Sequence, residues 1–287
     1  MKLTPDIFEV LKKPTTIYHY TTSNIALENI LPFSTLRMNF LRNTNDPREY
    51  KKFYFNSVGW GNFNDSNDKI GQAMRKIDNL RRNEFQVVSF SCNKEELYQN
   101  PSLPTYKQEG LLGCCKSRMW SQYGDNHKGI VLAFDSEKLK NTLVNQLNYQ
   151  FKVLSDKMSY ELVNIKEQLI LDNNKIINSE IEDYCTKYIF ENSNLIFFNK
   201  NPDYQDEDEY RIIIKSPNSN NVYLDIKDSL LAVLIGDMFP DGLLPSLKYL
   251  SSKLNVECKR VYWEAGIPLL FDCKPLDLEL NKDWNDI

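Results

Sequence analysis

The sequence predicts an α+β fold in which mixed, mainly antiparallel split sheets are flanked by helices. Short segments rich in β-branched and aromatic residues recur along the chain, and segments with apolar residues at helical spacing lie between them. The composition agrees, because 41% hydrophobic residues, with 16 Tyr and 15 Phe among the aromatics, supply material for a sizeable core. We therefore expect a single domain over residues 1–287, without repeats.

The first part of the chain predicts strands that alternate with helices. Residues 15–22 (TTIYHYTT) are typical of a strand, and the segment after them begins with Ser23, a candidate N-cap, and continues with helical apolar spacing. Further strands are expected at residues 34–40 and 85–92, and helices at residues 47–55 and 70–83.

The rest of the chain predicts more strands around a helical insertion at about residues 156–199. That stretch contains no Pro or Gly and spaces apolar residues at helical intervals, so it predicts one long helix or a helical pair. Residues 244–254 predict another helix. Strands are expected at residues 129–135, 149–154, 209–215, 221–226, 230–236 and 256–263.

Charge, cysteine usage and motifs disfavour several classes of function. A net charge of −4 gives no overall attraction for nucleic acid or an anionic membrane. Six cysteines without a C-x-x-C pair, and only two histidines, disfavour a zinc site, so we expect no metal. The P-loop, Rossmann, zincin and nucleophile-elbow motifs are absent from the sequence. Without a signal peptide or a membrane-length apolar run, we expect a cytoplasmic protein with no membrane partner.

Two aromatic segments contain the only histidines. His19 stands beside Tyr20 and Thr21, where it could orient a sugar hydroxyl, although a histidine in a strand is more often structural. Trp120, Tyr123 and His127 surround a Gly-Asp-Asn turn. Their rings could stack on a flat ligand, or the first two could simply form the buried face of a short helix.

A third segment gathers charge at the start of a strand. Alternation along the strand puts Glu207, Glu209 and Arg211 on one face. Such a cluster can tune the pKa of a carboxylate in either direction, whereas a plain surface charge cluster is the alternative.

Four separated motifs, in order, resemble the bacterial family called domain of unknown function 2971 (DUF2971). They are I-Y-H-Y-T-T, N-D-P-R-E, M-W-S-Q-Y-G-D-N-H-K-G-I and E-D-E-Y-R-I, spread over roughly residues 17–236. The family name carries no activity. A more distant similarity is to the ADP-ribosyltransferase superfamily, including DNA-modifying toxins of the DarT type, which open with a Y-H-x-T strand, a helix and an Asn-Asp loop.

This second resemblance implies an ADP-ribosyltransferase-like core and NAD as the substrate. His19 would contact the adenosine ribose and Glu209, or failing that Glu207, would stabilise the ribosyl cation, while Tyr123 is a stacking candidate. The chain departs from the usual pattern in lacking a clear S-T-S strand, although Ser89 and Ser91 lie on a central strand. The other residues expected to hold the nucleotide are Tyr20, Thr21, Arg37, Asn45, Asp46, Trp120, His127 and Arg211.

The leading hypothesis is thus an NAD-dependent ADP-ribosyltransferase-like enzyme, acting on an acceptor macromolecule that the sequence does not identify, in the setting of a toxin or phage defence. A second hypothesis is a non-catalytic module that binds a nucleotide or peptide, with the helical insertion docking a protein partner. A third is a metal-dependent nuclease that uses Asp46, Glu49, Glu207 and Glu209 as ligands.

Overall fold

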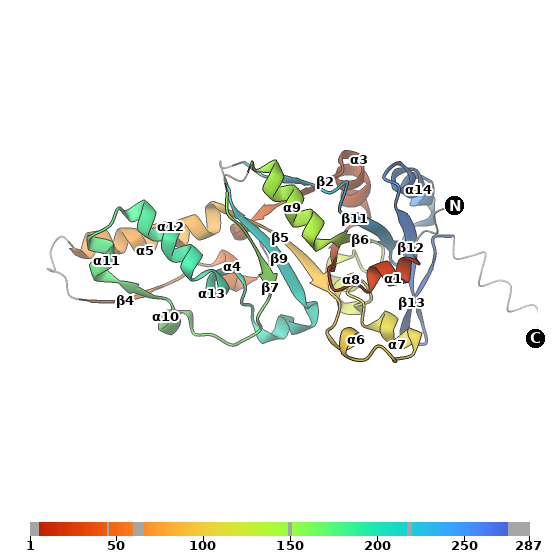
Figure 1. Cartoon of the computed structure of the whole chain (residues 1–287), viewed down its shortest axis with the longest axis horizontal. Helices are drawn as coiled ribbons and strands as arrows, with labels where there is room; N and C mark the ends of the chain where they lie inside the picture. Colours follow the sequence, from red (N-terminus) through yellow and green to blue (C-terminus); the bar gives the residue numbers. More distant parts are fainter. Residues whose placement is uncertain (1–5, 45, 60–65, 149–150, 217–219, 275–287) are drawn as a thin grey trace, which may run out of the picture.

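The fold is α+β, and its strands form a mixed, largely antiparallel sheet with helices on both faces, as the sequence predicts (Figure 1). The computed structural model describes residues 6–44, 46–59, 66–148, 151–216 and 220–274. None of the helices in these ranges is long and apolar enough to cross a membrane.

In the described part of the chain, nine strands form one main sheet in the order β13-β12-β11-β6-β1-β5-β9-β7, with β3 paired to β5. Neighbouring strands are antiparallel except β11 and β12, which are parallel. The strands are β1 (Thr16–Thr21), β3 (Asn39–Phe40), β5 (Phe85–Cys92), β6 (Ile130–Asp135), β7 (Val153–Lys157), β9 (Glu209–Lys215), β11 (Leu230–Ile235), β12 (Glu257–Glu264) and β13 (Ile267–Asp272). Two strand pairs lie apart from this sheet: β2 (Thr35–Arg37) with β10 (Tyr223–Asp225), and β4 (Asn56–Val58) with β8 (Ile170–Asp172).

Helices cover both faces of the central strands, which explains why β6 is a nearly continuous apolar run rather than an alternating one. Alternate residues of β1 enter different cores, with Ile17 on one face and Tyr18 and Tyr20 on the other. The first core contains residues of α9 (Ser136–Gln146), α14 (Leu244–Lys253) and the helical run α2 (Ser23–Ile25), Ala26–Ile30 and α3 (Leu31–Phe33). The second contains residues of α1 (Ile7–Leu11), α6 (Glu96–Gln99) and α8 (Ser117–Tyr123), and α7 (Thr105–Gly110) packs near β13.

A third core fills the lobe at the left of Figure 1, and two separate parts of the sequence build it. The expected helix over residues 70–83 is present as α5 (Ser66–Asn83), and it packs against α12 (Ile181–Glu191). Around this pair lie α10 (Ile165–Gln168), α11 (Asn173–Ile177) and α13 (Ser193–Phe197).

The prediction of one long helix or a helical pair over residues 156–199 is wrong. β7 extends to Lys157, and the rest divides into four short helices and the strand β8. Polar caps explain the division, because the side chains of Asn164 and Asp172 accept backbone N–H groups at the starts of α10 and α11.

Three smaller expectations also change. The helix expected over residues 47–55 is the short α4 (Pro47–Tyr50), because the chain beyond it is held extended by Asp78, which accepts from the Phe53 N–H, and by Arg81, which donates to the Lys51 carbonyl. The N-cap of α2 is Thr22 rather than Ser23. The strand expected at residues 149–154 begins at Val153, and residues 149–150 lie outside the described residues.

The sheet opens locally between β1 and β5. These strands pair only at Ile17 with Cys92 and at Tyr18 with Ser91, whereas β3 pairs further along the same edge of β5, at Val87 and Gln86. No strand pairing is present on that edge at residues 88–90 among the described residues. A gap therefore lies in the middle of the main sheet.

Candidate functional site

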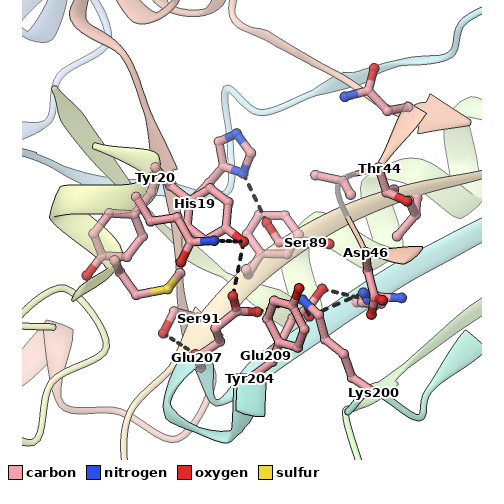
Figure 2. A pocket seen from close by; sticks show the side chains of 18 of the residues that line it. His19, Tyr20, Thr44, Asp46, Ser89, Ser91, Lys200, Tyr204, Glu207 and Glu209 are labelled. Atoms are coloured by element: carbon pink, nitrogen blue, oxygen red, sulfur yellow. Dashed lines mark hydrogen bonds and ion pairs between the residues drawn. The ribbon is translucent and has the colours of Figure 1, made fainter. Parts of the chain in front are cut away.

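A cavity of about 240 Å³ lies at this gap, close to the lower end of the range typical of ligand pockets. Its walls come from β1, from residues 87–91 of β5, from the segment between β2 and α4, from the end of α8 and from residues 200–211. The pocket thus joins segments that are far apart in the sequence (Figure 2).

Two buried glutamates share one ammonium group in the pocket. Lys200 Nζ lies 2.7 Å from Glu207 Oε2 and 3.1 Å from Glu209 Oε2, and each of the three side chains is less than 10% exposed. Glu209 begins β9, while Glu207 ends the 3₁₀ turn Pro202–Glu207 before it. The strand alternation expected for the pair is therefore replaced by a turn, but both carboxylates still reach the same cavity.

Arg211 holds Glu209 in a bidentate pair. Its Nε lies 2.6 Å from Glu209 Oε1 and its Nη2 lies 3.2 Å from Oε2. The same guanidinium pairs with Glu49 and donates to the carbonyl of Phe197 at 3.1 Å. A bidentate guanidinium fixes the plane of the carboxylate as well as its charge.

The charges of this cluster stabilise one another. Burial alone would raise the pKa of Glu209, but Arg211 and Lys200 hold it at about 2. Burial would lower the pKa of Lys200, yet the two glutamates raise it above its ordinary value. Glu209 and Lys200 are therefore both ionised at neutral pH.

Hydrogen bonds position the Glu207 carboxylate and its backbone. The hydroxyl of Tyr123, at the end of α8, donates to Glu207 Oε1 at 3.0 Å. The Glu207 carbonyl accepts from Ser91 Oγ at 2.7 Å and from Lys116 Nζ at 3.0 Å. Asp208 then turns the chain in a left-handed conformation, with φ 42°. This turn aims Glu207 back into the pocket, beside Glu209.

His19 lies in the gap between the strands and bridges it with one side-chain hydrogen bond. Its Nδ1 lies 3.0 Å from the carbonyl oxygen of Ser89, as Figure 2 shows. A carbonyl can only accept, so the proton of the neutral ring lies on Nδ1 and Nε2 is an acceptor. Burial lowers the pKa of His19 below its ordinary value of 6.5, so the ring is neutral at pH 7.

Asp46 lies on a different wall of the pocket from His19 (Figure 2). It is the N-cap of α4, and its Oδ1 accepts from the Arg48 N–H at 2.9 Å. Its other oxygen, Oδ2, is buried and has no hydrogen-bond partner among the described residues. The pocket therefore contains an acceptor that the described protein leaves unused.

The comparisons with known proteins give one match. Residues 119–212 match the family model described as "Protein of unknown function (DUF2971)". This stretch resembles that family. No curated protein and no solved structure matches the chain.

The stretch that resembles DUF2971 contains one side of the pocket. Tyr123, Lys200, Glu207, Glu209 and Arg211 lie within it, whereas β1 and α4 lie before it in the sequence. The expected resemblance to DUF2971 is confirmed for this stretch, and the carboxylate cluster is its buried polar centre.

The structure brings most of the expected site residues together. Those that line the pocket are His19, Tyr20, Arg37, Asp46, Tyr123, Glu207, Glu209 and Arg211. Asn45 lies outside the described residues.

Three expected residues do not line the pocket. Trp120 is fully buried, packs against Tyr20 and donates from its ring to the carbonyl of Cys114 at 2.8 Å. His127 stacks on Trp120 and lies 3.5 Å from Asp237. Thr21 is buried in β1. The placement of Trp120 agrees with the alternative that it is part of the buried face of a short helix.

Three residues of the cluster were not predicted from the sequence, namely Lys200, Tyr160 and Tyr204. The ring of Tyr204 lies under the Lys200 ammonium, 4.3 Å from its centre, and the Tyr160 hydroxyl accepts from the Glu209 N–H at 2.7 Å. Glu49, which the sequence suggests only as a metal ligand, is instead the second carboxylate on Arg211. Among the described residues, no group of three or more His, Cys, Asp or Glu side chains is arranged to hold a metal ion.

Proposed function

We propose that the pocket binds NAD and cleaves its nicotinamide glycosidic bond, as an ADP-ribosyltransferase-like enzyme. The main support for this proposal is the pair of buried glutamates that line one cavity. Glu209 and the Lys200 that bridges the pair are both ionised. When the bond breaks, its electron pair leaves with nicotinamide and positive charge develops on the ribose. The ribose carbon then bonds to the oxygen or nitrogen of water or of an acceptor, which releases a proton. A fixed carboxylate beside that sugar stabilises the charge.

Glu207 is better suited than Glu209 to face the sugar. Glu209 gives one oxygen to Arg211 Nε and shares the other between Arg211 and Lys200. Glu207 accepts one bond on each oxygen, from Tyr123 and from Lys200, so each oxygen keeps a lone pair. Glu209 then positions Lys200 and Arg211, and Glu207 meets the developing charge.

The other residues on the walls suit the remaining parts of NAD. His19 Nε2 is a neutral acceptor suited to a ribose hydroxyl, and Tyr123 offers a ring beside Glu207 for the nicotinamide. The cavity is small for a dinucleotide, so the pyrophosphate would extend over the rim. There Arg37, exposed on β2, offers a guanidinium for it.

One observation favours a non-catalytic binding module as a second candidate. Both oxygens of Glu209 are already engaged, which is also the arrangement of a structural ion network. In such a module the same pocket would hold a nucleotide without cleaving it. The helical insertion, which was expected to dock a partner, does not support this candidate. The apolar residues Cys185, Tyr188 and Ile189 of α12 are buried in the third core rather than exposed for docking.

The test is calorimetric titration of NAD with nicotinamide release followed in parallel, on the wild type and on His19→Ala and Glu207→Gln. We expect His19→Ala to weaken binding by about tenfold, and Glu207→Gln to lower release by roughly 10²-fold to 10³-fold while binding persists. Glu95→Gln, which removes only an exposed pair with Lys157, is the matched control. Binding without any release in the wild type would favour the binding module, and no binding at millimolar NAD would overturn both.

A further inference from the structure

We propose that Asp46 determines which sugar the pocket accepts, by taking a hydrogen bond from a hydroxyl of the nicotinamide ribose through its free oxygen. The inference rests on the proposed function and goes beyond it, since it assigns Asp46 one partner on the substrate. It starts from Asp46, which lines the cavity and whose buried Oδ2 atom has no hydrogen-bond partner among the described residues.

Local structure fixes where this carboxylate lies. Asp46 precedes Pro47, which occupies the first turn of α4, and its Oδ1 caps the helix by accepting the Arg48 N–H. The side chain is 6% exposed, so it cannot turn to solvent while the cap is kept. The guanidinium of Arg48 is directed to Asn199 and to the carbonyl of Leu195.

A series of contacts connects Asp46 to the carboxylates. Glu49 lies on the same helical turn, with its backbone N–H donating to the Asp46 carbonyl at 2.9 Å. The Glu49 side chain pairs with Arg211, and Arg211 holds Glu209. Figure 2 shows Asp46 and Lys200 on the same side of the pocket, with Glu209 next to them. Asp46 therefore lines the same pocket as Glu207, where the sugar would lie.

The chemistry of a carboxylate defines the ligand group. A carboxylate oxygen accepts and does not donate, so it favours a hydroxyl and repels a phosphate. A site built to bind a substrate hydroxyl rejects an analogue that lacks it, because the buried acceptor is then left without a partner. The nicotinamide ribose offers its 2′- and 3′-hydroxyls, and the other donors on NAD are the nicotinamide carboxamide, the adenosine ribose hydroxyls and the adenine amine.

The experiment uses Asp46→Asn, which keeps an oxygen to cap α4 but replaces the free acceptor with an NH₂ donor. Asp46→Ser, which also caps helices well, is a second variant. Melting temperatures within a few degrees of the wild type would show that both variants fold. Each protein is titrated with NAD, with NAD analogues lacking the 2′- or the 3′-hydroxyl of the nicotinamide ribose, and with the hypoxanthine analogue that lacks the adenine amine.

We expect the wild type to bind one of the two deoxy analogues at least about tenfold more weakly than NAD, and the hypoxanthine analogue about as well as NAD. Asp46→Asn and Asp46→Ser should bind NAD about tenfold more weakly and should not distinguish it from that deoxy analogue. Discrimination that survives both substitutions, or a wild-type preference that falls on the adenine amine, would overturn the inference and leave the proposed function standing. Absence of NAD binding by the wild type would instead overturn the proposed function, and the inference with it.

Discussion

The Nδ1 atom of His19 lies 3.0 Å from the carbonyl oxygen of Ser89, across the gap where β1 and β5 stop pairing. This side-chain bond occupies a carbonyl on the unpaired part of the β5 edge, and it fixes the tautomer of the ring. In the gap, the Ser89 carbonyl therefore has a hydrogen-bond donor, and His19 presents an acceptor at Nε2.

The first prediction concerns the pH dependence of NAD binding. Burial lowers the pKa of His19 below 6.5, so the ring is neutral from pH 8 down to at least 6.5 and gains a proton only below that. Protonation turns Nε2 into a donor. We expect NAD affinity to stay constant between pH 8 and pH 6.5 and to fall at lower pH, as measured by calorimetry. His19→Ala should lose this dependence, whereas a wild-type loss of affinity already between pH 8 and pH 7 would contradict the assignment.

The second prediction concerns Lys200, which neutralises two buried carboxylates. Lys200→Met should destabilise the protein by about 3–5 kcal/mol, because Glu207 and Glu209 would be left close together with Arg211 as the remaining cation of the cluster. Chemical denaturation measures this change. Lys187→Met is the matched control, since Lys187 and Glu191 form an exposed pair at 3.8 Å, and it should cost less than about 0.5 kcal/mol. Equal effects from the two substitutions would mean that the cluster adds nothing to stability.

Glu209 gives a third prediction, for acid stability. Its pKa falls from 4.5 to about 2 on folding, and the group is 5% exposed. Because the folded pKa is depressed, the stabilisation is present above pH 4.5 and is lost as the pH falls towards 2. A shift of about 2.5 pH units at about 1.4 kcal/mol each corresponds to roughly 3 kcal/mol.

Denaturation at several pH values tests this prediction. Glu209→Gln should be less stable than the wild type at pH 7, and the difference should shrink between pH 4.5 and pH 2. A difference that is independent of pH would show that Glu209 contributes through packing rather than through its charge.

Local sequence patterns predicted most strands, because the apolar and β-branched runs of β5, β6 and β9 are buried in the sheet whatever their neighbours. The same patterns did not predict the structure of residues 156–199. Polar residues there can lie inside a helix or cap its start, and tertiary packing decides between the two. Composition and spacing therefore predicted the strands of the main sheet except β13, but not the architecture of the third core.

The site shows a similar division. Glu209 and Arg211 stand two residues apart on a strand, so alternation alone puts them on one face. Lys200 lies between α13 and a 3₁₀ turn, and only the fold brings it to the glutamates. Trp120 and Tyr123 both belong to α8, yet Trp120 packs edge-on against Tyr20 while Tyr123 reaches Glu207. Spacing could not distinguish these environments.

The fourth prediction separates His127 from the pocket. Its ring stacks on Trp120 with the centroids 6.2 Å apart and lies edge-on to Trp263, and it does not line the cavity. His127→Ala should change NAD affinity by less than about twofold, while the lost packing costs about 1–3 kcal/mol in a denaturation experiment. A large loss of NAD affinity in His127→Ala, with stability unchanged, would indicate that His127 contacts the ligand and would contradict this prediction.

The last prediction separates the two roles of Tyr123, whose hydroxyl orients Glu207 and whose ring is the candidate for stacking on nicotinamide. Tyr123→Phe keeps the ring and removes the hydroxyl, so we expect kcat for nicotinamide release to fall by about tenfold with KM unchanged. Tyr123→Ala removes both and should also raise KM, because stacking is worth about 0.5–1.5 kcal/mol. Equal KM values for the two variants would exclude stacking, and an unchanged kcat in Tyr123→Phe would mean that Lys200 alone suffices to orient Glu207.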